Sequence, residues 1–193
     1  MPFELEKVVP WGRSFEEYAS IFSLTINDLN KEILGCSDGP ASFNIEMKRN
    51  GRVCTSVDPI YQFTDVEIKK RITESFDEVL SQTRKNKNEF IWKNIKSVEE
   101  LGKTRKNAME QFLADFELGK KENRYIAGAL PRLNLKNQQF DLALCSHFLL
   151  FSVCPELFHK TLKNYQPEYL QIRQAYLAGR YRFYDARVNQ DGR

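Results

Sequence analysis

Hydrophobic residues in the first third of the chain fall in short runs, and they predict two strands around one helix. Ile33-Leu34 is an apolar pair that ends at a stretch of small residues, 35–42, and a helix is expected from Phe43 to about Arg49. Residues 52–57 are rich in β-forming side chains and end at Asp58-Pro59, where proline prevents further pairing. The order strand, helix, strand predicts two parallel strands joined by a crossover.

Helix start signals divide the chain further. In each, a Ser or Thr is followed three residues later by an acid, so that the two side chains can cap each other's backbone amides. Apolar residues recur at steps of three and four over 68–83 and 101–116, which predicts two long helices. Residues 61–121 are therefore expected to form a helical insertion between the second and third strands. The signals lie at Ser14–Glu17, Thr25–Asp28, Thr64–Glu67 and Ser97–Glu100.

Two more strands are expected after this insertion. Residues 124–127 read as the third, and 140–146 as the fourth, which is nearly all apolar as a strand buried on both faces should be. Residues 167–178 look helical, Gly179 ends that pattern, and 180–188 fit a short edge strand. The pattern predicts an α/β fold of the Rossmann-like, doubly wound type, with a mostly parallel sheet.

Composition describes an ordinary globular protein with an unusual final segment. The 193 residues are 41% hydrophobic and 28% charged. A net charge of +3 is too small to support nucleic-acid binding. Residues 160–193, however, carry seven Lys and Arg against three acids, and five of the eight tyrosines. We expect a main domain over 1–150 and an atypical basic, tyrosine-rich segment over 151–193.

Neither a membrane nor a metal is expected. The longest apolar stretch, 142–153, is too short to span a bilayer, and residues 1–9 lack the apolar block of a signal peptide. The cysteines are Cys36, Cys54, Cys145 and Cys154, with no CxxC pair and no spacing of a structural zinc site. We therefore expect reduced thiols in a cytoplasmic protein.

A ligand is expected where the first two strands end. In a doubly wound sheet the crevice beyond the carboxyl ends of the strands binds ligands. Gly35 and Gly39 let the backbone approach a ligand closely, and Asp58 is placed to accept hydrogen bonds from a ribose diol. Neither the dinucleotide fingerprint nor the phosphate-binding loop is present, so an adenosine ligand without pyrophosphate fits best. A structural turn with a helix-capping aspartate explains the same residues.

Several ordered motifs resemble those of class I S-adenosylmethionine-dependent methyltransferases. Over about residues 8–150 the sequence resembles a poorly characterised bacterial branch of that family, including Val9-Pro-Trp-Gly-Arg-Ser14 and Tyr61-Gln-Phe63. The motifs are Ile33-Leu-Gly-Cys-Ser-Asp-Gly-Pro-Ala-Ser42, Val57-Asp58-Pro59, Leu133-Asn-Leu135 and Phe140-Asp-Leu-Ala-Leu144.

The resemblance implies a methyltransferase with S-adenosylmethionine as cofactor and an unknown methyl acceptor. The loop from Gly35 to Gly39 would lie under the methionyl part and the sulfonium, and Asp58-Pro59 would hold the ribose. Trp11 and Arg13, which precede the first capped helix, would fold over the cofactor, and Arg13 would reach a carboxylate or be exposed. The remaining cofactor positions are Cys36, Ser37 and Asp38 in the loop, Ala129 and Leu130 at the adenine, and Cys145 and Ser146 beside the methyl group.

His147 is the candidate general base, because an imidazole with a pKa near 6.5 can accept a proton at neutral pH. A histidine packed at the end of a strand is the competing interpretation.

The sequence departs from the family pattern in three places. Ser37 replaces the middle glycine of the loop, and Ala129 stands where many members carry an aspartate. The family's sheet continues beyond the fourth strand, whereas 151–193 do not read as those strands, so an incomplete C-terminal half is expected. The fourth strand would then be an exposed apolar edge, which a homodimer could cover. A catalytically inactive, shortened binding or interaction module is the alternative function.

Overall fold

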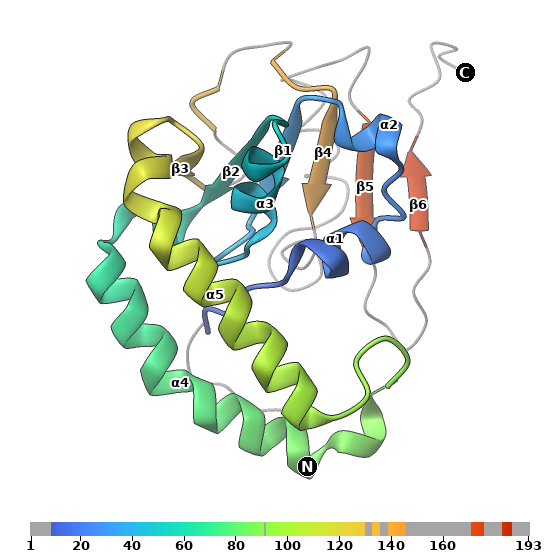
Figure 1. The fold of residues 1–193 in the computed structure, drawn as a ribbon, viewed down its shortest axis with the longest axis vertical. Coiled ribbons are helices and arrows are strands. Elements are labelled where there is room, and N and C mark those ends of the chain that lie inside the picture. Colours follow the sequence, from blue (N-terminus) through green and yellow to red (C-terminus); the bar gives the residue numbers. More distant parts are fainter. Residues whose placement is uncertain are drawn as a thin grey trace.

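A computed structural model describes residues 9–90, 92–129, 133–135, 139–145, 171–175 and 183–186. Its centre is a six-stranded sheet in the order β3-β2-β1-β4-β5-β6 (Figure 1). The first five strands in this order are parallel, and β6 is antiparallel to β5. The strands are β1 (Ile33–Cys36), β2 (Cys54–Asp58), β3 (Tyr125–Ala127), β4 (Leu142–Cys145), β5 (Gln171–Ala175) and β6 (Phe183–Ala186).

The helices begin where the sequence signals predict. Ser14, Thr25 and Thr64 each form a reciprocal capping box with the acid three residues later, and Ser97 accepts a hydrogen bond from the Glu100 amide. None of the described helices is long and apolar enough to cross a membrane. The helices are α1 (Phe15–Ile21), α2 (Ile26–Leu29), α3 (Phe43–Arg49), α4 (Asp65–Lys85) and α5 (Val98–Lys121), with short 3₁₀ turns η1 (Pro59–Gln62) and η2 (Lys87–Glu89).

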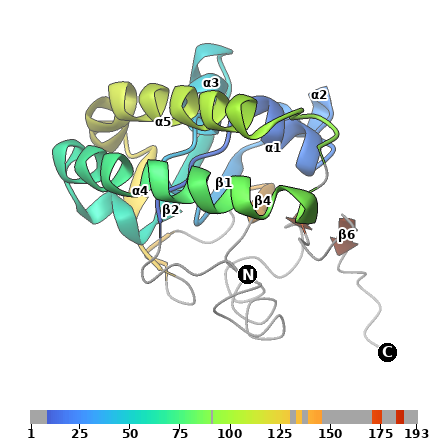
Figure 2. The same ribbon diagram turned by 90° about the horizontal axis from the view of Figure 1, so that it is seen from below.

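The core lies on both faces of the central strands, because alternate residues of a strand point to opposite faces. α1 and α3 cover one face of the sheet (Figure 2). On this face, Ile33, Leu142 and Leu144 pack against apolar side chains of these helices. On the other face, Leu34 and Ala143 belong to a second cluster. The predicted α/β fold with a mostly parallel sheet is confirmed.

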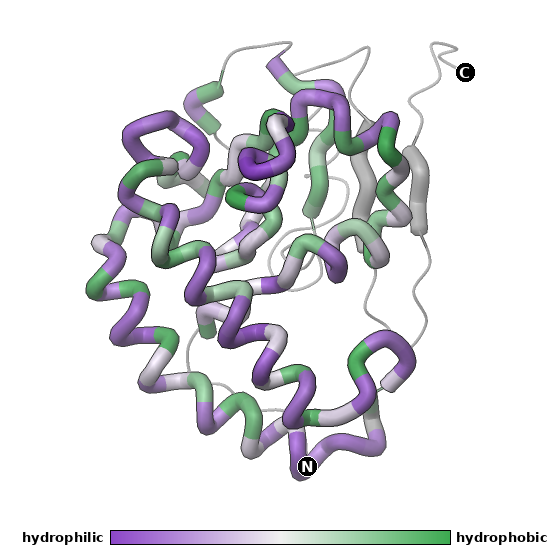
Figure 3. Tube along the Cα trace, in the orientation of Figure 1, coloured by the Kyte–Doolittle hydropathy of each residue, from purple (hydrophilic) through white to green (hydrophobic). Residues whose placement is uncertain are grey.

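The predicted helical insertion consists of α4 and α5, which run side by side (Figure 1). Both helices alternate hydrophobic and hydrophilic residues along their length (Figure 3). Phe112 and Phe116 of α5 pack with Tyr61 and Tyr125 beside the sheet. α4 packs on α5, and Ile68 near its start joins the same cluster. Thus α5 also serves as the crossover helix between β2 and β3. The other end of the pair extends past the ends of the strands toward which β4 points (Figure 1).

The C-terminal expectations need correction. A helix was expected over 167–178, but residues 171–175 form β5, parallel to β4. The fourth strand is therefore not an exposed edge, because β1 and β5 occupy its two sides. The sheet continues beyond β4, and the reason given for a homodimer along that strand no longer holds. The short edge strand expected over 180–188 is confirmed as β6, residues 183–186. Pairing between distant segments overrides local helical propensity at 171–175.

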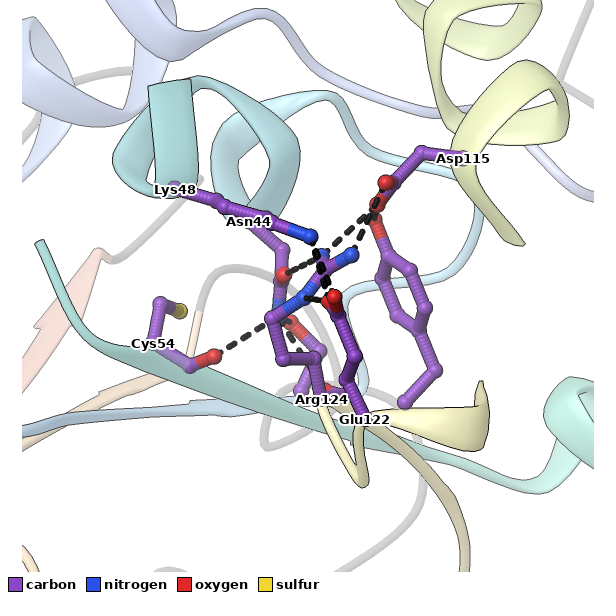
Figure 4. Close-up of polar contacts among 8 residues, drawn as sticks. Asn44, Lys48, Cys54, Asp115, Glu122 and Arg124 are labelled. Atoms are coloured by element: carbon purple, nitrogen blue, oxygen red, sulfur yellow. Dashed lines mark hydrogen bonds and ion pairs between the residues drawn. The ribbon is translucent and has the colours of Figure 1, made fainter. Parts of the chain in front are cut away.

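A buried polar network joins the sheet to α3 and α5 (Figure 4). Arg124, just before β3, forms two hydrogen bonds to the Asp115 carboxylate at 2.7 and 2.8 Å and a third to Asn44 Oδ1 at 2.7 Å. The Asn44 amide in turn donates to the carbonyl oxygens of Cys54 and Arg124 at 3.0 and 3.1 Å. These bonds fix α3 and α5 against β2 and the start of β3.

Candidate functional site: the loop after strand β1

The loop after β1 is tied to the end of β2 by one carboxylate. Asp58 Oδ2 accepts a hydrogen bond from the Gly39 amide at 2.9 Å, and its Oδ1 accepts one from the Ile60 amide at 2.8 Å. The second bond caps η1, as the structural interpretation of Asp58 expected. A carboxylate offers about four acceptor positions, so both oxygens retain capacity for a further donor. Burial raises the pKa of Asp58, although these two amide hydrogen bonds oppose the shift.

A second contact holds the same glycine from the other side. The Tyr61 hydroxyl donates a hydrogen bond to the Gly39 carbonyl oxygen at 2.7 Å. The Tyr61 ring is fully buried, with its centroid 5.8 Å from that of Phe112 and 5.7 Å from that of Phe116. Gly39 is therefore held at both its amide and its carbonyl, and the aromatic cluster under α5 fixes the group that holds the carbonyl.

The side chain of Asp38 lies beneath the loop and accepts two short hydrogen bonds. The Tyr18 hydroxyl donates to its Oδ1 at 2.7 Å, and the Ser56 hydroxyl donates to its Oδ2 at 2.7 Å. Gly35 makes room for this carboxylate, because a Cβ at position 35 would overlap Asp38 Oδ2. Burial, together with the nearby Asp58 carboxylate, raises the pKa of Asp38 to about 6, against the two hydroxyl hydrogen bonds.

The loop backbone passes through two left-handed residues. Gly39 has φ of +57°, which glycine adopts at no steric cost, and Ser37 has φ of +55°, which is uncommon for a residue with a Cβ. The Ser37 amide donates to the Val57 carbonyl oxygen at 2.8 Å and so continues the pairing between β1 and β2 by one residue. Ser37 therefore keeps the turn that a glycine would make, at a conformational cost.

A small hollow opens beside this turn. Its empty volume is about 160 Å³, and Cys36, Ser37, Val57, Gly128 and Leu133 line it. Ligand pockets for small molecules usually measure about 300–1,000 Å³. The hollow is far smaller than that, because its 160 Å³ includes open solvent and leaves no enclosed room for a water molecule. It lies at the same ends of β1 and β2 as the Asp58 carboxylate.

The structure brings most of the predicted cofactor residues to one edge of the sheet. The residues that meet there are Gly35, Cys36, Ser37, Asp38, Gly39, Asp58 and Pro59, and Cys145 pairs with Cys36 in the neighbouring strand. Ala129 is described and exposed, just after β3. Leu130, Ser146 and His147 lie outside the described residues. The candidate base is therefore not placed, and its role stays a prediction.

Sequence reasoning missed the side chains that support the loop, namely Tyr18, Ser56 and Tyr61. The signal for Ser56 was present, since it alternates with Val57 along β2 and so shares a face with Cys54 and Asp58. Tyr61 was expected only as part of a motif, and no pattern in the sequence pointed to the hydroxyl of Tyr18. Their hydroxyl contacts depend on how α1 and η1 dock on the sheet.

The segment before α1 packs directly on the loop. A Cβ at Gly12 would overlap the Pro40 carbonyl oxygen, and the Ser42 amide donates to the Arg13 carbonyl oxygen at 3.0 Å. The Trp11 ring lies 5.4 Å from the Phe76 ring of α4, centroid to centroid. The segment expected to fold over the cofactor thus lies between the loop and the helical pair.

The Arg13 guanidinium contacts the Glu17 carboxylate at 3.4 Å, and Arg105 of α5 pairs with the same carboxylate. Burial raises the pKa of Glu17, but the Arg105 guanidinium, the Ser14 amide and the Arg13 guanidinium together outweigh it and leave that pKa below its ordinary value.

Comparisons with known proteins assign no activity to this arrangement. No family model matches the chain, and no solved structure matches it. It is 34% identical over 159 residues to a protein of Methanocaldococcus jannaschii named "Uncharacterized protein MJ0045", and the match covers 81% of this chain and 71% of that protein. At this identity and coverage, the chain belongs to the same family as MJ0045.

Proposed function

We propose that the protein is a Rossmann-like, class I methyltransferase that binds S-adenosylmethionine at the loop after β1. The strand order supports this proposal. The chain moves outward from β1 through β2 to β3, then returns to place β4 on the other side of β1. In open α/β sheets, ligands bind at such a reversal, beyond the carboxyl ends of the strands. The Gly35–Gly39 loop leaves β1 at that point.

The single observation that carries the proposal is the contact between Asp58 and Gly39. It brings the carboxylate that would hold a ribose diol to the loop that would lie under the methionyl part of the cofactor. The absence of a dinucleotide fingerprint in the sequence favours an adenosyl ligand over one with a pyrophosphate. A shallow hollow beside Ser37 and Gly128 lies at the same edge.

The chain's own residues would contribute binding and positioning more than chemistry. Bound S-adenosylmethionine would supply an activated methyl group, so the protein needs to hold it and align an acceptor. We place the acceptor side at the ends of α4 and α5 that extend past the strands (Figure 1). Trp11, packed on Phe76, lies between these helices and the loop.

Binding of the cofactor tests the proposal. A thermal-shift titration with S-adenosylmethionine and S-adenosylhomocysteine, with NAD and ATP as controls, should show a selective rise in melting temperature. Asp58→Asn should weaken binding of both adenosyl compounds roughly tenfold, because the neutral amide cannot form charge-assisted bonds to the ribose. Asp77→Asn, an exposed aspartate on α4, is the matched control. A cooperatively folded wild type that binds neither compound would overturn the proposal.

A second candidate, an inactive cofactor-binding or interaction module, is favoured by the small hollow and by Ser37. The Cβ of Ser37 occupies the position at which the loop would approach the cofactor, and the hollow is smaller than usual pockets. The inactive module was first suggested by the strands expected to be missing after the fourth, but β5 and β6 follow β4 in the sheet. Transfer of a labelled methyl group to any acceptor by the purified chain would eliminate this alternative.

A further inference from the structure

The carboxylate of Asp38 is a buried negative charge that no cation neutralises within the described part of the chain. Asp38 is 7% exposed, and its hydrogen-bond partners are the neutral hydroxyls of Tyr18 and Ser56. No lysine, arginine or histidine of the described residues forms an ion pair with it. Buried carboxylates are normally paired, because removing a charge from water is costly.

The other ionisable groups around Asp38 do not supply the missing charge. Cys36 on β1, Cys54 on β2 and Tyr61 on η1 stay neutral at pH 8, because burial and the Asp38 charge raise each pKa. Tyr18, on α1, contributes only its hydroxyl to this carboxylate, and the second nearby acid, Asp58, adds negative charge.

Arg124, the cation of the buried polar network, is linked to Asp38 only through two intervening residues. Its guanidinium reaches Asn44, which contacts Ser56, and it is already paired with Asp115. The region under the loop is therefore electronegative.

The residues around Asp38 hold its carboxylate in place, although burying that charge reduces stability. Position 35 lacks a Cβ where the carboxylate lies, and hydroxyls from two separate elements, α1 and β2, meet its two oxygens. The backbone of the same loop is held by Asp58 and Tyr61 at Gly39, one residue away. A side chain that reduces stability while the fold accommodates it in detail is typical of a functional position.

Resting on the proposed function, we propose that Asp38 is a positioning residue that fixes the loop and makes the site prefer the cationic sulfonium of S-adenosylmethionine to the neutral thioether of S-adenosylhomocysteine. The Asp38 side chain lies beneath the loop and does not contact the ligand. Its charge acts across the loop backbone between Gly35 and Gly39. In a site of low dielectric, a fixed charge a few ångströms away interacts strongly with a ligand charge. The neutral product of methyl transfer gains nothing from that charge, so it leaves more readily.

The test compares the affinities of the two compounds by calorimetry at pH 8. Asp38→Asn keeps the size of the side chain and can still bond to both hydroxyls, but it removes the charge. We expect a roughly tenfold loss of affinity for S-adenosylmethionine and little change for S-adenosylhomocysteine. Asp77→Asn should alter neither. Equal losses for both compounds would overturn the proposal, because they would mean that Asp38 supports the loop by shape alone.

The pH dependence gives a readout that a purely structural role would not move. In the wild type, the preference for the cationic compound should fall as the pH drops through about 6, where Asp38 takes up a proton. Tyr18→Phe removes a donor to the ionised carboxylate, so the fall should move to higher pH, and Asp38→Asn should abolish it. An unchanged profile in both variants would overturn the proposal. A folded wild type that binds neither compound at pH 8 would instead overturn the proposed function itself.

Discussion

Arg124 and Asp115 form a bidentate ion pair that joins the start of β3 to α5, with N–O distances of 2.7 Å (Nη1 to Oδ2) and 2.8 Å (Nη2 to Oδ1). Both side chains are largely buried, and the Tyr125 hydroxyl donates to the same carboxylate at 3.1 Å. The pair connects α5 to the sheet next to the start of β3 (Figure 4).

Breaking this pair should destabilise the fold strongly. Arg124→Met leaves the buried Asp115 carboxylate without its cation, which costs about 3 kcal/mol of unfolding free energy in comparable sites. Urea denaturation measures the change. Arg84→Met, which removes an exposed pair with Glu99, is the matched control and should have little effect. Equal effects of the two substitutions would contradict the structural role of Arg124.

The charge of Asp38 should reduce stability in a pH-dependent way. Its pKa rises from 3.8 to about 6 on folding, so the folded state binds more protons than the unfolded state between these values. The contribution of Asp38 to stability is therefore present below pH 4 and lost as the pH rises to about 6, with a total loss of roughly 3 kcal/mol.

Asp38→Asn makes this effect measurable by chemical unfolding at a series of pH values. The variant should gain stability relative to the wild type between pH 4 and pH 6, and the advantage should then stay constant to pH 8. Other acids titrate alike in both proteins, so their contributions cancel in the difference. A difference that does not change with pH would show that Asp38 does not carry a raised pKa.

The absence of a side chain at position 35 should be essential. Gly35→Ala places a Cβ on the Asp38 carboxylate, so the loop must move, at a cost on the order of 2 kcal/mol. Gly51→Ala is the control, because nothing lies within 4 Å of its Cβ and only its φ of +67° is strained.

A double-mutant cycle isolates the Gly35–Asp38 contact. In the Asp38→Ala background the overlapping atoms are gone, so Gly35→Ala should cost less there than in the wild type. Additive effects would show that the two positions do not interact.

The described cysteines should resist modification in the native protein. Cys36, Cys54 and Cys145 are buried, and burial raises the pKa of the Cys36 and Cys54 thiols. The thiolate is the reactive form, so iodoacetamide at pH 8 should label these positions only after unfolding in urea. Peptide mapping by mass spectrometry would locate the label. Fast labelling of Cys36 without denaturant would show that the loop opens on its own.

Local patterns in the sequence determined the beginnings of helices and the first four strands. Ser14, Thr25 and Thr64 form the capping boxes that their spacing predicts, because a cap needs only residues three positions apart. The helix over Phe43–Arg49 has the predicted bounds. The meeting of the Gly35–Gly39 loop with Asp58 was also predictable, because the carboxyl ends of adjacent parallel strands share one edge of a sheet.

Only the tertiary structure decided how segments far apart in the chain meet. Residues 171–175 are helical by local pattern, but their pairing with β4 makes them a strand and removes the free edge expected there. Tyr18 and Ser56 are 38 residues apart in the sequence, yet their hydroxyls meet on the two oxygens of Asp38. Hydrogen bonds of this kind depend on the docking of whole elements, which the spacing of residues along the chain does not encode.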